Sequence, residues 1–268
     1  MKKTIALFCV IYLGLLISKS YCQANKELLL ADSSKYIGEV QNDIPSGKGT
    51  ITYTNGDTFT GKFVNGLKAK GKYDWVNGDK YDGEFKNDTL NGAGTYYYNN
   101  GDKFTGTYLK GKKVKGKFEW KDGSKYEGAI KDDFPNGYGT FNFMNGDKYS
   151  GTYVLGVKIH GEYEYADGDK YVGDITEDLP NGPGTFYYSS GEYITVPFKN
   201  GKANGAGEFF FKNGDYYQGD FEEGYPTYGK NYNKDGGEKP DDDGGNSVIA
   251  VKEMITITPF LSSVLILL

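Results

Sequence analysis

The chain repeats a short motif over most of its length, and this repeat limits its fold more than any other feature. Nine units begin with an aromatic or aliphatic residue, and glycine follows two residues later in every unit except the eighth, which has Val196. Longer and shorter units alternate along the chain and differ in length by one residue; only the last spacing between units breaks this alternation. The units therefore combine in pairs. A unit this short cannot bury a core alone, so the repeat predicts an elongated stack of mutually packed units. The opening residues are Tyr36, Phe59, Tyr81, Phe104, Tyr126, Tyr149, Tyr171, Ile194 and Tyr217.

Turn and strand signals inside the units predict β-hairpins. Dipeptides such as Asn55-Gly56 close most units, and between apolar runs they favour hairpin turns in which both central residues have positive φ. Alternating aromatics such as Tyr96 and Tyr98 place rings on one strand face, and a second turn signal at 133–137 divides its unit into two strands. The 40 glycines and 25 tyrosines agree with short strands and many turns. We therefore predict an all-β fold, an elongated single-layer antiparallel sheet of β-hairpin units.

The glycine near the start of each unit is expected to leave a gap that a neighbouring ring fills. The array is expected to span residues 36–229, with residues 25–35 as its N-terminal cap and the incomplete last unit at its other end. The structural repeat positions of the odd units are Tyr36, Gly38, Tyr81, Gly83, Tyr126, Gly128, Tyr171 and Gly173.

The repeat resembles a known family. Tyr-x-Gly-Glu-Phe at 81–85, followed by Gly92-x-Gly94, is similar to the membrane occupation and recognition nexus (MORN) repeat, and the resemblance covers about 36–229. The even units depart from it by having a single glycine, as at Gly71 and Gly116. Choline-binding repeats, the alternative, lack the regular aromatic-x-Gly start. The resemblance implies a hairpin solenoid that acts as a scaffold, forms a homodimer or contacts acidic phospholipids, usually on the cytoplasmic side.

The first 24 residues have the pattern of a secretory signal peptide. Lys2 and Lys3 precede an apolar run at 5–17, and a polar stretch with candidate cleavage sites after Cys22 or Ala24 follows. A transmembrane anchor would need about 20 apolar residues, and a bacterial lipobox would need other residues before Cys22. Both cysteines of the chain lie in this segment, so the mature protein is expected to have no thiol.

The C-terminal end has the pattern of a glycosylphosphatidylinositol (GPI) signal. An acidic, glycine-rich linker at 230–247 is followed by a hydrophobic segment at 248–268, in which the apolar run extends from Ile255 to the end. The small residues Gly244, Gly245 and Asn246 are the candidate attachment sites. A transmembrane tail and an interfacial or buried tail are the alternatives. We therefore expect passage through the secretory pathway and tethering at the cell surface through a lipid anchor.

Lysines of the even units form the candidate ligand site. Because they alternate along a predicted strand, we expect each triplet to share one face, as an anion-binding patch for lipid headgroups or acidic glycans. The alternative is a solvated edge that answers the acidic column Asp43, Asp88, Asp133 and Asp178. The candidate lysines are Lys68, Lys70, Lys72, Lys113, Lys115 and Lys117.

Two further features have structural alternatives. Trp75, Trp120 and Tyr165 recur at one position of the even units, either as a sugar-stacking ladder or as packing of the sheet face. Asn87 begins an Asn-Asp-Thr sequon, a possible glycosylation site in an exported protein.

Composition argues against several functions. The chain has no arginine, a net charge of −5 and a pI near 5.1, so nucleic acid is an unfavourable partner. The single histidine, His160, has no triad partner at a plausible spacing, and no motif for a metal or a cofactor is present. We expect a non-enzymatic interaction scaffold whose protein partner the sequence does not name. The alternative is a peripheral lipid- or glycan-binding module.

Overall fold

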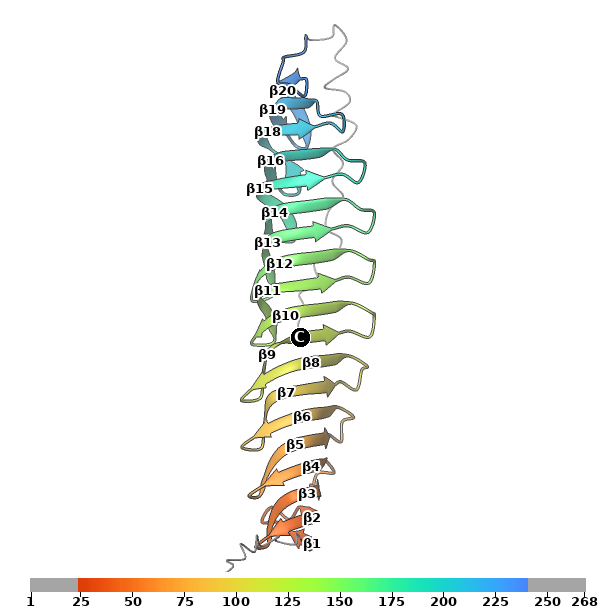
Figure 1. Ribbon diagram of the computed structural model, residues 1–268, viewed down its shortest axis with the longest axis vertical. Coiled ribbons are helices and arrows are strands. Elements are labelled where there is room, and N and C mark those ends of the chain that lie inside the picture. Colours follow the sequence, from red (N-terminus) through yellow and green to blue (C-terminus); the bar gives the residue numbers. More distant parts are fainter. Residues whose placement is uncertain (1–23, 241–268) are drawn as a thin grey trace, which may run out of the picture.

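The computed structural model describes residues 24–240, which form one antiparallel sheet of 20 strands. The strands lie across the long axis and are stacked along it in chain order (Figure 1). Each strand pairs with the strands before and after it, and the short β17 and β18 together take the place of one strand opposite β16. The predicted elongated, all-β, single-sheet fold is confirmed. The strands are β1 (Ala24–Leu29), β2 (Lys35–Gln41), β3 (Ile44–Thr52), β4 (Thr58–Val64), β5 (Leu67–Asp74), β6 (Lys80–Lys86), β7 (Thr89–Tyr97), β8 (Lys103–Leu109), β9 (Lys112–Glu119), β10 (Lys125–Lys131), β11 (Phe134–Asn142), β12 (Lys148–Val154), β13 (Val157–Glu164), β14 (Lys170–Thr176), β15 (Leu179–Tyr187), β16 (Tyr193–Lys199), β17 (Lys202–Ala203), β18 (Gly205–Phe210), β19 (Tyr216–Glu222) and β20 (Tyr225–Tyr232).

Two kinds of turn join the strands, and their assignment corrects the prediction from sequence. The tight two-residue turns with two positive φ angles lie inside the units, as at Asn42 (φ 53°) and Asp43 (φ 62°). This is the combination that a right-twisted hairpin requires. In the Asn-Gly sequences that close the units, only the glycine has positive φ, as at Gly56 (φ 94°). Tyr53 N donates to Asp57 O at 2.9 Å, so these are wider loops.

The one-residue difference between odd and even units comes from β-bulges. In the first unit the register shifts by two residues between Gly38–Gly49 and Val40–Pro45. In the second unit it shifts by only one, between Lys62–Lys70 and Phe63–Lys68. The extra residue of the odd units is therefore in the bulge, because the turns at both ends have the same length in odd and even units.

The core lies along the inner face of the sheet. The opening rings of the units, such as Tyr36 and Phe59, are 0% exposed. Since no second sheet or helix covers them among the described residues, the sheet itself must curve around them. Edge-to-face contacts link the rings of successive units, for example Phe59 to Phe85 at 5.2 Å between centroids.

The two ends of the sheet are formed by β1 and β20. The expected N-terminal cap is a strand, β1, which pairs with β2 along its full length. The expected linker from residue 230 does not begin there, because β20 continues to Tyr232. The chain then turns back, so that Lys239 N donates to Asn231 O at 2.8 Å. The array therefore extends beyond the boundary expected at residue 229, to Tyr232, and residues 234–240 are exposed.

Candidate functional site

A row of glycines crosses the strands along most of the sheet. In the register of the fifth unit, Gly128 lies opposite Gly116 on one side and Gly139 on the other. A Cβ atom at Gly128 would lie 2.6 Å from the Cα of Gly139 and 2.8 Å from Cζ of Tyr126. The ring that covers Gly128 thus belongs to the opening residue of the same unit, two positions earlier, and the same ring covers Gly139 on the next strand. The odd-unit repeat positions form one packing site, in which the glycine leaves room for its own tyrosine.

The eighth unit replaces this arrangement by another. Ile194 takes the place of the opening ring and Val196 that of the glycine, and both side chains are buried. The smaller opening residue leaves the space that the valine fills. The strand opposite is interrupted between β17 and β18, so this unit is locally irregular.

The predicted lysine triplets do not share a face. The bulge in β5 lies between Lys68 and Lys70, so Lys68 points inward while Lys70 and Lys72 are exposed on the outer face. Lys68 Nζ lies 5.4 Å from the ring centroid of Tyr53 and 3.4 Å from Asp88 Oδ1. The one-face prediction is wrong because a bulge changes which residues point inward.

The same ring-and-carboxylate setting recurs in later even units. Lys113 Nζ contacts Asp133 Oδ1 at 3.0 Å and lies 5.6 Å from the ring centroid of Tyr98. Lys158, whose side chain is 7% exposed, lies 2.8 Å from Asp178 Oδ1. These lysines therefore form ion pairs with the aspartates of the acidic column, as in the alternative from sequence. They do so from the inner face and not from a solvated edge.

The outer-face lysines have both lysines and acidic residues as cross-strand neighbours, since Lys62 lies opposite Lys48 on one side and Lys70 on the other. Lys70 lies opposite Glu84, Lys72 opposite Asp82, and Lys117 opposite Glu127 in the strand register. Lys115 lies between Thr107 and Ala129.

Glu119 joins two of the lysines on β8 and β9. Its carboxylate lies 2.6 Å from Lys103 Nζ and 2.9 Å from Lys117 Nζ. The hydrogen bond from Lys103, and then that from Lys117, lower the pKa of Glu119 to about 2. The charge of Lys117 is therefore already matched within the protein.

A continuous column of rings contains the three recurrent aromatics. Trp75 lies 4.5 Å from Tyr73 and 5.2 Å from Tyr96, between ring centroids. Trp120 and Tyr165 occupy equivalent places, which favours packing over a sugar-stacking ladder for all three. The column consists of Tyr53, Tyr73, Trp75, Tyr96, Tyr98, Phe118, Trp120, Phe141, Phe143, Tyr163, Tyr165, Phe186, Tyr188, Phe209 and Phe211.

Aspartates of the wide loops tie consecutive units together, a role that the sequence reasoning missed. Asp57 accepts hydrogen bonds from Val76 N at 2.9 Å and from Tyr73 Oη at 3.0 Å. The bond from Val76 N is the main cause that lowers the pKa of Asp57. Asp147 is bonded in the same way to Ala166 and Tyr163. The signal was the aspartate that follows most Asn-Gly pairs.

The described part of the chain is electrically polarised along its length. Residues 24–126 contain 17 lysines and 13 acidic residues, whereas residues 127–240 contain 10 lysines and 19 acidic residues. The N-terminal half therefore carries net positive charge and the C-terminal half net negative charge.

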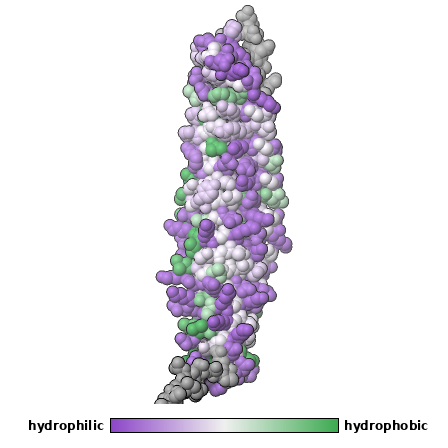
Figure 2. Space-filling model, viewed as in Figure 1, coloured by the Kyte–Doolittle hydropathy of each residue, from purple (hydrophilic) through white to green (hydrophobic). Residues whose placement is uncertain are grey.

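Figure 2 shows that polar side chains cover most of one face and that apolar patches are small and separate.

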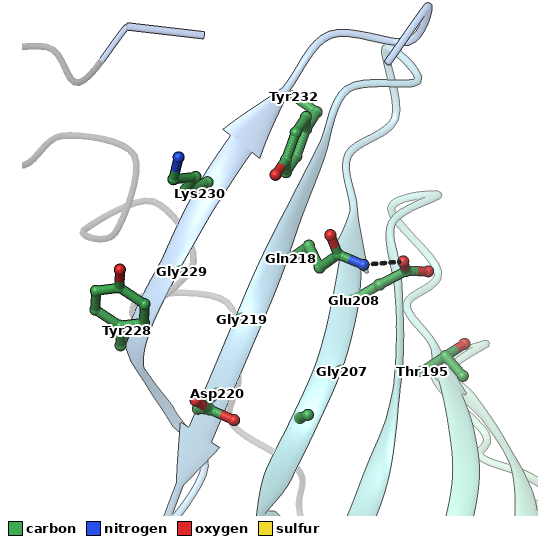
Figure 3. A pocket seen from close by; sticks show the side chains of 11 residues that line it. Thr195, Gly207, Glu208, Gln218, Gly219, Asp220, Tyr228, Gly229, Lys230 and Tyr232 are labelled. Atoms are coloured by element: carbon green, nitrogen blue, oxygen red, sulfur yellow. Dashed lines mark hydrogen bonds between the residues drawn. The ribbon is translucent and has the colours of Figure 1, made fainter. Parts of the chain in front are cut away.

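Shallow troughs lie on the outer face at both ends of the glycine row. The C-terminal trough has a volume of about 640 Å³ and a floor formed by Gly207, Gly219 and Gly229. Figure 3 shows Glu208 and Asp220 on neighbouring strands of this trough. Its other lining residues are Thr195, Ala206, Gln218, Tyr228, Lys230 and Tyr232.

The N-terminal trough has a similar volume and a floor formed by Gly38, Gly49 and Gly61. Its charged side chains are Lys48, Lys62 and Glu39, a net positive charge. The two troughs thus occupy equivalent places in the sheet but carry opposite charge.

The remaining candidate residues fall in two places. Asn87 is exposed at the tight turn between β6 and β7 (φ 50°), where a glycan would meet solvent. Gly244, Gly245 and Asn246 lie outside the described residues, as do most of segment 1–24 and all of 248–268. Within residues 24–240, no group of three His, Cys, Asp or Glu side chains could hold a metal ion. No helix in that range is long and apolar enough to cross a membrane.

Comparison with known families identifies the repeats. The MORN repeat profile matches residues 36–58, 59–80, 81–103, 104–125, 126–148, 171–193 and 198–216, more than half of the chain. The chain belongs to the MORN repeat family. The sixth unit, from Tyr149, is outside these matches but forms the same hairpin, β12 with β13.

Among solved structures, the chain is similar to the TCP domain of SAS-4 from Drosophila melanogaster, solved with a proline-rich motif of Ana2. The identity is 19%, the alignment covers 65% of this chain and 90% of that one, and the TM-score is 0.39. The G-box domain of the microcephaly protein CPAP is 10% identical, with 81% and 97% covered and a TM-score of 0.26. No curated protein matches the chain.

Proposed function

We propose that this protein is a non-enzymatic interaction scaffold that is exported and tethered at the cell surface by a GPI anchor. MORN repeats support a repeat-based interaction scaffold. The observation that carries the proposal is the single continuous sheet, in which aspartates, rings and lysine–aspartate pairs link each unit to the next. These links make an elongated body with a large outer surface for partners.

The two terminal patterns support export and tethering. Residues 1–24 have the order of a signal peptide, and residues 248–268 have that of a GPI signal after the small residues at 244–246. A tether at this end holds the acidic half of the array nearer the membrane and the basic half farther from it.

Phospholipase treatment of intact cells tests the proposal. Phosphatidylinositol-specific phospholipase C should release the protein into the medium, with an N-terminus at residue 23 or 25. A matched variant that ends at residue 247 should be secreted without phospholipase, because it has no segment to exchange for the anchor. Protein that keeps Met1 and stays inside the cell would overturn the proposal.

The alternative function, binding of lipids or glycans through the lysines, has weaker support. Lys68 and Lys113 are engaged with Asp88 and Asp133, and Lys72 and Lys117 lie opposite acidic residues, whereas Lys70 lies opposite Lys62 as well as Glu84. Vesicles containing phosphatidylserine and sulfated glycans, titrated over a salt series, test it, because a contact driven by charge weakens steeply with salt.

A further inference from the structure

The C-terminal trough combines negative charge, rings and a floor of strand backbone. Among the described residues, no ion pair involves Glu208 or Asp220, and Glu208 accepts a hydrogen bond from Gln218 at 3.0 Å. Figure 3 shows Tyr228 and Tyr232 on β20, the strand next to that of Asp220. Tyr228 is 76% exposed, so its ring is available to a partner.

We propose that this trough binds an extended, lysine- or arginine-rich segment of a partner protein. The inference deepens the scaffold role proposed above by naming the chemistry of one partner, and it does not depend on the membrane tether.

Charge complementarity selects a basic partner. The surrounding half of the array has 19 acidic residues against 10 lysines, so its field attracts cations. Lys230, which lines the trough, is held by Glu238 at 2.7 Å and is therefore neutralised locally. The equivalent trough at the other end carries Lys48 and Lys62 against Glu39, a net positive charge that would repel the same segment.

The protein itself shows how such a site holds an ammonium group. Lys158 lies between the Asp178 carboxylate and the rings of Phe143 and Tyr149, at 5.4 and 5.7 Å from their centroids. On the outer face, Lys170 Nζ lies 4.9 Å from the ring centroid of Tyr187. A carboxylate and an aromatic ring together stabilise an ammonium group that has lost part of its hydration shell.

The shape of the trough, which runs across adjacent strands, favours an extended chain over a globular partner. At Gly207, Gly219 and Gly229 the backbone of three adjacent strands lines the trough, between outward-pointing side chains such as Glu208 and Asp220. From β16 to β20 the trough crosses three interstrand steps of about 4.8 Å, a length that about four extended residues cover. Two side chains of such a segment would face the sheet, one for each carboxylate.

Binding of a fluorescent peptide to the full-length protein tests the proposal. The probe is a six-residue peptide of alternating lysine and glycine, and the control probe has glutamate in place of lysine. Fluorescence anisotropy should show saturable binding of the lysine peptide alone, with affinity that falls as salt rises. The double variant Glu208→Gln/Asp220→Asn should bind about tenfold more weakly, and Tyr228→Ala about threefold more weakly. Lys230→Gln should bind more tightly.

The matched control is Lys48→Gln/Lys62→Gln in the other trough, which should leave lysine-peptide binding unchanged. Equal binding of both probes, or no loss in Glu208→Gln/Asp220→Asn, would overturn the proposal. Sedimentation that shows self-association abolished by the same double variant would also overturn it, because the trough would then be occupied by a second copy. Release by phospholipase is measured separately, so failure of the tether and failure of the trough are distinguishable.

Discussion

Substitution of Gly128 by valine tests whether the glycine row is the packing site described above. A Cβ atom there would lie 2.6 Å from the Cα of Gly139 and 2.8 Å from Cζ of Tyr126. Overpacking of a core typically costs about 1–3 kcal/mol. Since the Cα of the partner strand cannot rotate away, we expect a loss in the free energy of unfolding near the upper end, about 3 kcal/mol. For an array of this size that corresponds to a decrease in Tm of about 6–12 °C.

The eighth unit suggests a second substitution that should restore part of this loss. It has Ile194 and Val196 where the fifth unit has Tyr126 and Gly128, so the smaller opening residue and the larger second residue fit together. Tyr126→Ile alone removes a buried ring and should cost about 2–3 kcal/mol. The double variant Tyr126→Ile/Gly128→Val should cost less than the sum of the single variants by at least about 1 kcal/mol.

Urea unfolding followed by far-ultraviolet circular dichroism measures all three variants. The matched control is Gly219→Val near the C-terminal end, where the same contacts are 2.6 Å to the Cα of Gly229 and 2.6 Å to Tyr217 Oη. Because a terminal unit has fewer neighbours to lose, this variant should lower the midpoint less than Gly128→Val does. Additive costs for the two substitutions in the fifth unit would refute the reasoning.

Three other predictions follow from the ion pairs and the turn. Asp178→Asn should lower the free energy of unfolding by about 2 kcal/mol, because it leaves the 7%-exposed Lys158 amine without its carboxylate, whereas Lys158→Met should cost less than about 1 kcal/mol in the same urea titration. The pKa of Glu119 is lowered from 4.5 to about 2, so its ion pairs stabilise the fold fully above pH 4.5 and are lost as the pH falls through 2. Unfolding midpoints of Lys103→Met should therefore change less over that interval than those of the wild type, and parallel curves would contradict this. Protein from the secretory pathway should carry one glycan at Asn87, seen as a mass shift that glycosidase treatment and Asn87→Gln both abolish.

The repeat determined what could be predicted about the fold. Period, glycine spacing and alternating aromatics correctly indicate hairpins in one elongated sheet, because each unit has to bury its rings on the next. The location of the tight turns was not predictable from Asn-Gly alone, since residues such as Asn42 and Asp43 form them without glycine. In the wide loops, the glycine is required because it is the residue that has the positive φ, as at Gly56.

The candidate site was less predictable than the fold. The inward position of Lys68 depends on the bulge in β5, and strand alternation alone cannot show a bulge. The one-residue difference between odd and even units was visible in the sequence, but only the pairing register shows that the extra residue lies in the bulge. The pairing of Lys158 with Asp178 likewise needs the curvature that brings both to one place.

The ring column has a consequence for spectroscopy. The two tryptophans of the chain, Trp75 and Trp120, both lie in the N-terminal half, each in contact with rings on either side. Their emission therefore reports the local order of that half, and excited tyrosines of the column can transfer energy to them only where the column is intact. Circular dichroism averages over every strand. If the C-terminal units unfold first, the two signals will not coincide, and their difference will map the order in which the array comes apart.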